Sequence, residues 1–127
     1  MRITKHGPEY DALHYVLDHD TPSDILAELV NSKGVQIRIY LAMNRNTPPA
    51  AHMVLAKDAV ADVRYEVAAN YRSPPAALTI LAEDGHEDIV YAVSRNPNTP
   101  PLVKMWLETY RDSGMSLVQF LEVANVG

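Results

Sequence analysis

The chain has 127 residues, of which 47% are hydrophobic, so it is apolar enough to form one domain with a modest core and is not a disordered tail. It contains no cysteine, which excludes disulfides, iron–sulfur ligation by thiolates, cysteine zinc sites and cysteine nucleophiles. The formal net charge of −5 excludes a global basic footprint for nucleic acid and leaves only a local basic patch open.

The beginning of the chain carries no apolar segment of the kind that signal peptides contain. No apolar run approaches the length needed to span a bilayer. We therefore expect a cytoplasmic protein without a membrane partner.

The first predicted helix covers residues 8–18. Its apolar residues fall one repeat period before their equivalents in the next unit: Leu13, Tyr15 and Leu17 precede Ile39, Leu41 and Met43. We interpret the segment as an N-terminal capping helix, which covers an end that would otherwise expose apolar surface.

A repeat of 26 residues follows this helix. A Thr-Pro or Ser-Pro pair opens each unit, at Thr21, Thr47, Ser73 and Thr99, and the units cover residues 21–46, 47–72, 73–98 and 99–124. Self-similarity at such a period is the signature of a solenoid, in which each unit packs mainly on its neighbours. The predicted fold is therefore all-α: a short α-solenoid of about four helical pairs that forms a single domain over residues 1–127.

Each unit is predicted to hold two short helices. The Thr or Ser suits the N-cap of the first helix, with proline at the next position. The second helix, as in residues 63–70, ends at an asparagine, which tolerates the left-handed geometry that ends helices. Leucines recur eight positions into each unit and are expected to form one continuous buried line: Leu29, Leu55, Leu81 and Leu107.

The repeat pattern degrades in the second half of the fourth unit, as is typical of terminal repeats. We expect residues 115–124 to form the C-terminal cap. Homo-oligomerisation through an imperfectly capped end stays open, with Leu117, Phe120 and Leu121 as the exposed candidates.

The pattern resembles a known repeat class. The segments Leu-Ala-Lys-Asp at 55–58, Leu-Ala-Glu-Asp at 81–84 and Val-Arg-Tyr-Glu-Val-Ala-Ala-Asn at 63–70 are similar to the leucine-rich repeat variant family, itself close to HEAT-like repeats. The resemblance covers about residues 20–112 and implies a right-handed superhelix. Some members carry an iron–sulfur cluster in a Cys-rich segment, which cannot transfer to a chain without cysteine.

The similarity to HEAT repeats also implies a ladder between units, made by an Asp in the inter-helix turn and an Arg six residues later. Asp58 and Arg64 match that pattern in the second unit. The first unit has Ser32 in place of the Asp, and the third has Val90 in place of the Arg. The implied ladder is therefore incomplete.

The second helices offer the best candidate for a contact surface. Residues eighteen and twenty-two positions into a unit lie roughly opposite the main buried positions, because each residue turns a helix by about 100°. The candidate partner-binding residues are Ile39, Met43, Tyr65, Tyr91 and Arg95. Aromatic and Arg anchors suit protein docking, and packing against the next repeat is the alternative role for the same residues.

Arginines form a second candidate surface. Arg38 and Arg64 occupy equivalent positions in successive units, and three more arginines fall near the ends of second helices: Arg45, Arg72 and Arg95. Together the five could line one basic edge that binds nucleic acid or phosphate. A solvated face with ladder pairs is the alternative.

We predict no metal, cofactor or catalytic site. His14 and Asp18 are four residues apart on a predicted helix and could share one metal ion. A metal site needs more ligands than two, and His19 is a poor third one. Acidic residues near the starts of second helices, such as Asp62 and Glu87, suit the positive helix end. No nucleophile elbow or phosphate loop is present. The predicted function is therefore protein binding, by an adaptor, inhibitor or scaffold with a preformed concave surface, and not catalysis.

Overall fold

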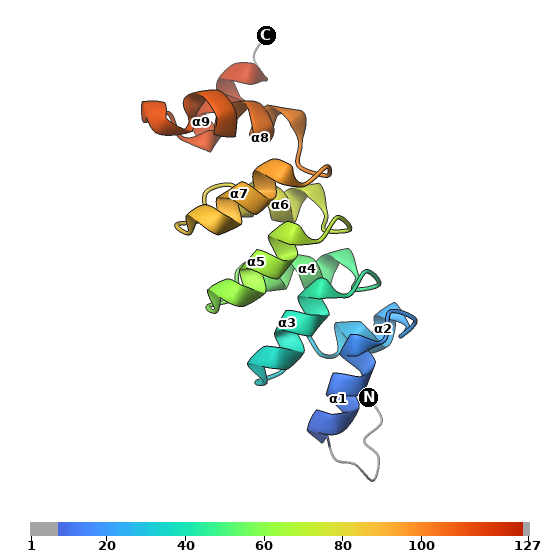
Figure 1. Cartoon of the computed structure of the whole chain (residues 1–127). Coiled ribbons are helices and arrows are strands. Elements are labelled where there is room, and N and C mark those ends of the chain that lie inside the picture. Colours follow the sequence, from blue (N-terminus) through green and yellow to red (C-terminus); the bar gives the residue numbers. More distant parts are fainter. Residues whose placement is uncertain (1–7, 126–127) are drawn as a thin grey trace.

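The computed structural model describes residues 8–125, which are all-helical and contain no strand (Figure 1). The α-helices are α1 (Pro8–Leu17), α2 (Ser23–Ala27), α3 (Val35–Met43), α4 (Pro49–Leu55), α5 (Ala61–Ala69), α6 (Pro75–Leu81), α7 (Glu87–Arg95), α8 (Pro101–Met105) and α9 (Leu117–Ala124). A π-helical turn (Trp106–Tyr110) and a 3₁₀ turn (Arg111–Ser113) continue α8. Within this range, every helix is too short or too polar to cross a bilayer.

The helices alternate between two rows (Figure 1). In the first row α1 packs on α3, α3 on α5 and α5 on α7. The shorter helices α2, α4, α6 and α8 follow one another in the second row, where α4 contacts α6. The N-terminal ends of α3, α5 and α7 lie at one edge of the molecule, and the turns that leave these helices lie at the opposite edge.

The core runs between the rows. Leu29, Leu55 and Leu81 are buried, and Leu107 is half-buried against the same core. The first-row helices contribute residues spaced i, i+4, which fall on one helix face: Ile37 and Leu41, Val63 and Val67, Ile89 and Val93. The apolar residues that recur in each unit therefore meet in one hydrophobic cluster.

The Thr and Ser of the repeat do not cap the helices that follow them, so this prediction is wrong. The first proline of the pair takes the cap position, and its neighbour, as in Pro48 and Pro49, begins the helix. The buried hydroxyl donates instead to a carbonyl six residues earlier, at 2.6 Å from Thr47 to Leu41 and from Ser73 to Val67. The backbone N–H of the following asparagine reaches the same carbonyls at longer distances, 3.2 Å from Asn44 to Leu41 and 3.3 Å from Asn70 to Val67. The hydroxyl therefore adds a second, shorter hydrogen bond at the end of the helix.

The repeated asparagines do not adopt left-handed geometry, which corrects a second expectation. Asn44, Asn70 and Asn96 are all extended, with φ between −70° and −80°. Their amide nitrogens instead donate to carbonyls of the preceding unit. Asn96 Nδ2 lies 2.8 Å from the carbonyl oxygen of Ala68 and 3.0 Å from that of Asn70. A side-chain amide carries two donors, so it can join both carbonyls, and these asparagines link successive units.

The Arg and Asp side chains of the predicted ladder form ion pairs, which we call rungs. Each rung joins two neighbouring units, and none pairs the Arg and Asp side chains of one unit. Arg38 Nε lies 2.7 Å from Asp58 Oδ2, and Arg64 Nε lies 2.8 Å from Asp84 Oδ2. Each Arg reaches the Asp of the following unit, so the Ser32 that breaks the pattern within the first unit does not break the rung. Residues 8–125 contain two such rungs, and Val90 stands where a third arginine would be.

The C-terminal unit departs from the others, as the loss of repeat pattern predicts. Gly114, with φ of 88°, lies between the 3₁₀ turn and α9, and Ser116 begins α9 with a capping box. Leu117 and Phe120 are buried, and Leu121 is half-buried against the core. The expectation that these residues are exposed is therefore wrong, because α9 packs on α8 and on the π-helical turn.

Candidate functional site

Three equivalent residues lie on neighbouring first-row helices. Ile39 on α3 is half-buried against the core, whereas Tyr65 on α5 is 38% exposed and Tyr91 on α7 is 65% exposed. Because α5 packs on both α3 and α7, these side chains occupy adjacent helices of one row. Of the two roles left open by the sequence, core packing therefore describes Ile39, and surface exposure describes the tyrosines.

The remaining candidate contact residues lie one turn further along the same helices. Met43 on α3 is 46% exposed, and Arg95, the last residue of α7, is exposed. We use the name tyrosine face for the surface formed by Met43, Tyr65, Tyr91 and Arg95.

A hollow lies between the C-terminal ends of α3 and α5. It is lined by Met43, Glu66, Ala69, Asn70 and Tyr71. Burial raises the pKa of the Glu66 carboxyl, and the neighbouring Asp62 carboxylate raises it further. Sequence reasoning missed Glu66 and Tyr71. The sequence feature that could have indicated this hollow is Tyr71, an aromatic residue at the position that Arg45 occupies one unit earlier.

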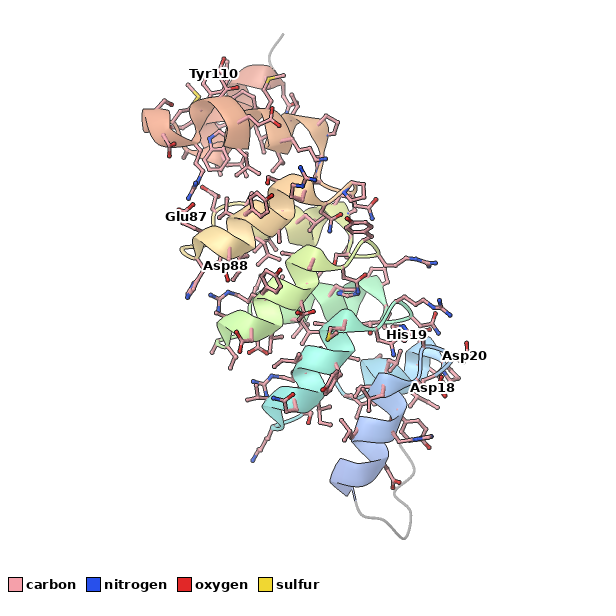
Figure 2. The ribbon with its side chains drawn as sticks, in the orientation of Figure 1. Asp18, His19, Asp20, Glu87, Asp88 and Tyr110 are labelled. Carbon is pink, nitrogen blue, oxygen red and sulfur yellow. The ribbon has the colours of Figure 1, made fainter. Side chains whose placement is uncertain are left out.

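A second hollow lies between α7 and the C-terminal unit. Tyr91 and Leu107 are among the residues that line it, and Glu87 and Arg111 form an ion pair there at 2.5 Å. The hydrogen bond and charge of Arg111 hold the pKa of the exposed Glu87 carboxyl below its usual value. Figure 2 shows Glu87 and Asp88 at the start of α7, beneath the unit that carries Tyr110. The tyrosine face therefore borders both hollows. Met43 lines the hollow between α3 and α5, and Tyr91 lines the hollow between α7 and the C-terminal unit.

The five candidate arginines do not form one edge. Arg38 and Arg64 lie in the first half of their helices and are engaged in the ion pairs with Asp58 and Asp84. Burial raises the pKa of each Asp carboxyl, but the hydrogen bonds from arginine and from a backbone N–H lower it overall.

The other arginines lie at the opposite ends of the first-row helices. Arg45, Arg72 and Arg95 are exposed, and none of them pairs with a carboxylate within residues 8–125. Of the five arginines, these three are left as candidates for a basic edge.

The histidine candidates lie near the start of the described chain, His14 on α1 and His19 at the turn between α1 and α2. Figure 2 shows His19 between Asp18 and Asp20 at the α1–α2 turn. The Nδ1 atom of His19 accepts the backbone N–H of Arg45 at 3.2 Å, so this histidine joins two successive turns. His14 packs edge-on against Tyr15. Across residues 8–125, no three His, Cys, Asp or Glu side chains come together as a metal site.

Comparisons of the chain with protein-family models, with curated proteins and with solved structures found no match.

Proposed function

We propose that the chain is a protein-binding module, an adaptor, inhibitor or scaffold, built as a right-handed α-solenoid of 26-residue helical pairs like those of leucine-rich repeat variant proteins. The observation that supports this function best is the exposure of Tyr65 and Tyr91 on adjacent helices. Exposed aromatic side chains that project from rigid elements provide large contact area at low conformational-entropy cost, and tyrosine is enriched where protein interfaces bind most strongly.

The rungs between units support the same proposal. Two Arg–Asp pairs join the first unit to the second and the second to the third. The amides of Asn44, Asn70 and Asn96 join α1 and the same three units in succession. A face whose helices are held in register before binding loses little conformational entropy when a partner docks. The tyrosine face is thus suited to act as a preformed surface.

The test is a double substitution, Tyr65→Ala with Tyr91→Ala. We expect capture of the partner from the native host to weaken by about tenfold or more, because interface tyrosines carry a large share of binding energy. Helicity by circular dichroism should be unchanged, because both side chains are exposed. The matched control is Val54→Ala with Ile80→Ala, two exposed apolar residues of the second row, which should leave capture unchanged. Equal capture by all three proteins contradicts the proposal.

Nucleic acid or phosphate binding through Arg45, Arg72 and Arg95 is the second candidate. Its support is that these three arginines have no carboxylate partner among the described residues. Release of counterions makes phosphate binding weaken steeply between low and moderate salt, whereas a hydrophobic protein interface changes little. Partner capture that persists at moderate salt therefore favours the tyrosine face, and capture that disappears favours the arginines.

A further inference from the structure

The hollow between α3 and α5 combines apolar walls with one carboxylate. Met43 and Tyr71 are 46% and 66% exposed, and Ala69 is exposed beside them, whereas Glu66 is half-buried. The apolar residues are open to a ligand, while the carboxylate is partly withdrawn from water. Such an arrangement favours a ligand that is apolar along its length and positively charged at its end.

No charge or hydrogen bond within residues 8–125 compensates the Glu66 carboxylate. The nearby charge that acts on it is Asp62, which is also acidic. The neighbouring Asn70 is already engaged: its Nδ2 donates to carbonyls of Ala42 and Asn44, and its Oδ1 accepts from a backbone N–H. The half-buried carboxylates of Asp58 and Asp84, by contrast, each pair with an arginine. Partial removal of an unpaired carboxylate from water is unfavourable, and pairing with a cation in the hollow would offset this desolvation penalty.

We propose that this hollow binds an arginine side chain of the partner protein, with the guanidinium paired to Glu66 and the aliphatic stem against Met43 and Tyr71. This inference rests on the proposed protein-binding function and names the chemistry of the partner. A guanidinium forks onto a carboxylate and stacks on an aromatic ring, whereas an ammonium is a compact, strongly hydrated charge. An apolar occupant would leave Glu66 buried and unpaired, and an acidic one would be repelled.

The hollow is specific to one place in the stack. At the position of Glu66, the preceding unit carries Tyr40 and the following unit carries Ala92. At the position of Met43, α7 carries Arg95, which would repel a guanidinium. A single arginine pocket in one row would therefore fix the position of a partner along the tyrosine face.

The test needs no knowledge of the partner. The probe is the peptide acetyl-Gly-Arg-Gly-amide, titrated into the ¹⁵N-labelled full chain and followed by amide chemical shifts. We expect saturable shifts at Met43, Glu66, Ala69 and Tyr71. The analogue with neutral citrulline should bind about tenfold more weakly or worse, because the charge-assisted pair is lost. Glu66→Gln should weaken arginine binding by a similar factor, and Glu83→Gln, at an exposed glutamate on another turn, should not.

Three results would overturn the inference. They are equal shifts at all acidic residues, unchanged binding in Glu66→Gln, and equally strong binding of the peptide acetyl-Gly-Lys-Gly-amide, in which lysine replaces the arginine. Circular dichroism of Glu66→Gln verifies folding, and removal of an unpaired charge should not unfold the chain. Partner capture by the variants distinguishes failure of the arginine pocket from failure of the proposed protein-binding function. If Glu66→Gln retains partner capture and the Tyr65 and Tyr91 double substitution loses it, only the arginine pocket is wrong.

Discussion

At the scale of single residues, His52 is a polar group at an apolar position. Its equivalents one unit before and after are Leu26 and Leu78, and all three side chains are fully buried. The Nδ1 atom lies 3.5 Å from the hydroxyl of Ser73, which already donates to a carbonyl, so a hydrogen bond between the two requires the proton on Nδ1. The Nε2 atom has no partner within the described residues. Burial disfavours the charged imidazolium and lowers the pKa of His52 to about 4.

This burial predicts a loss of stability in mild acid. The unfolded imidazole has its ordinary pKa of 6.5 and takes up a proton between pH 6.5 and pH 4, where the folded imidazole stays neutral. The unfolded state then binds more protons, so the free energy of unfolding falls as the pH falls. The full effect is about 3 kcal/mol across this window, at about 1.4 kcal/mol per pKa unit. Urea unfolding at several pH values measures it.

The variant His52→Leu isolates this contribution from other titrating groups, among them Glu66. It restores the residue type of the neighbouring units, and it should be more stable than the parent chain at every pH in the window. Its free energy of unfolding should lose the part of the slope that comes from His52. Parallel pH profiles for the two proteins would show that His52 titrates in the folded chain as it does in the unfolded chain.

At the scale of elements, the sequence predicted helix positions well and the roles of the recurring polar residues poorly. The sequence predicts the first helix at residues 8–18, and the helix spans Pro8–Leu17, because its boundaries depend on local signals. The partners of Asn96 and Arg64, however, belong to neighbouring units. Their hydrogen bonds depend on how two units pack, and the spacing of residues within one unit does not contain that information.

The asparagine link is predicted to be a major part of the contact between units. In Asn96→Asp, a carboxylate replaces the amide that donates to the carbonyls of Ala68 and Asn70. Because Asn96 is fully buried, we expect a loss of about 2 kcal/mol or more in the free energy of unfolding. Chemical denaturation measures the change.

The matched control is Asn31→Asp, which makes the same change of charge on an exposed turn. Its effect should stay within about 0.5 kcal/mol. Equal stability of the two variants would mean that the amide of Asn96 does not hold the units together.

At the scale of the whole molecule, the two rows decide which predicted residues are available to a partner. The spacing of Tyr65 and Tyr91 places them opposite the buried line of their helices, yet aromatic residues at helical spacing more often pack in a core than contact a partner. Their exposure depends on how closely α5 packs on α3 and α7. The hollow at Glu66 needs two units to form, so a search of single units could not find it.

The most direct test of the central claim is site-specific photo-crosslinking in the native host. Benzoylphenylalanine replaces Tyr65 on the first row or Ile80 on the second, two side chains of nearly equal exposure at 38% and 37%. We predict a discrete cross-linked species with a second protein from position 65 and none from position 80. Cross-links from position 80 alone, or a product with the mass of two copies of this chain, would contradict the account.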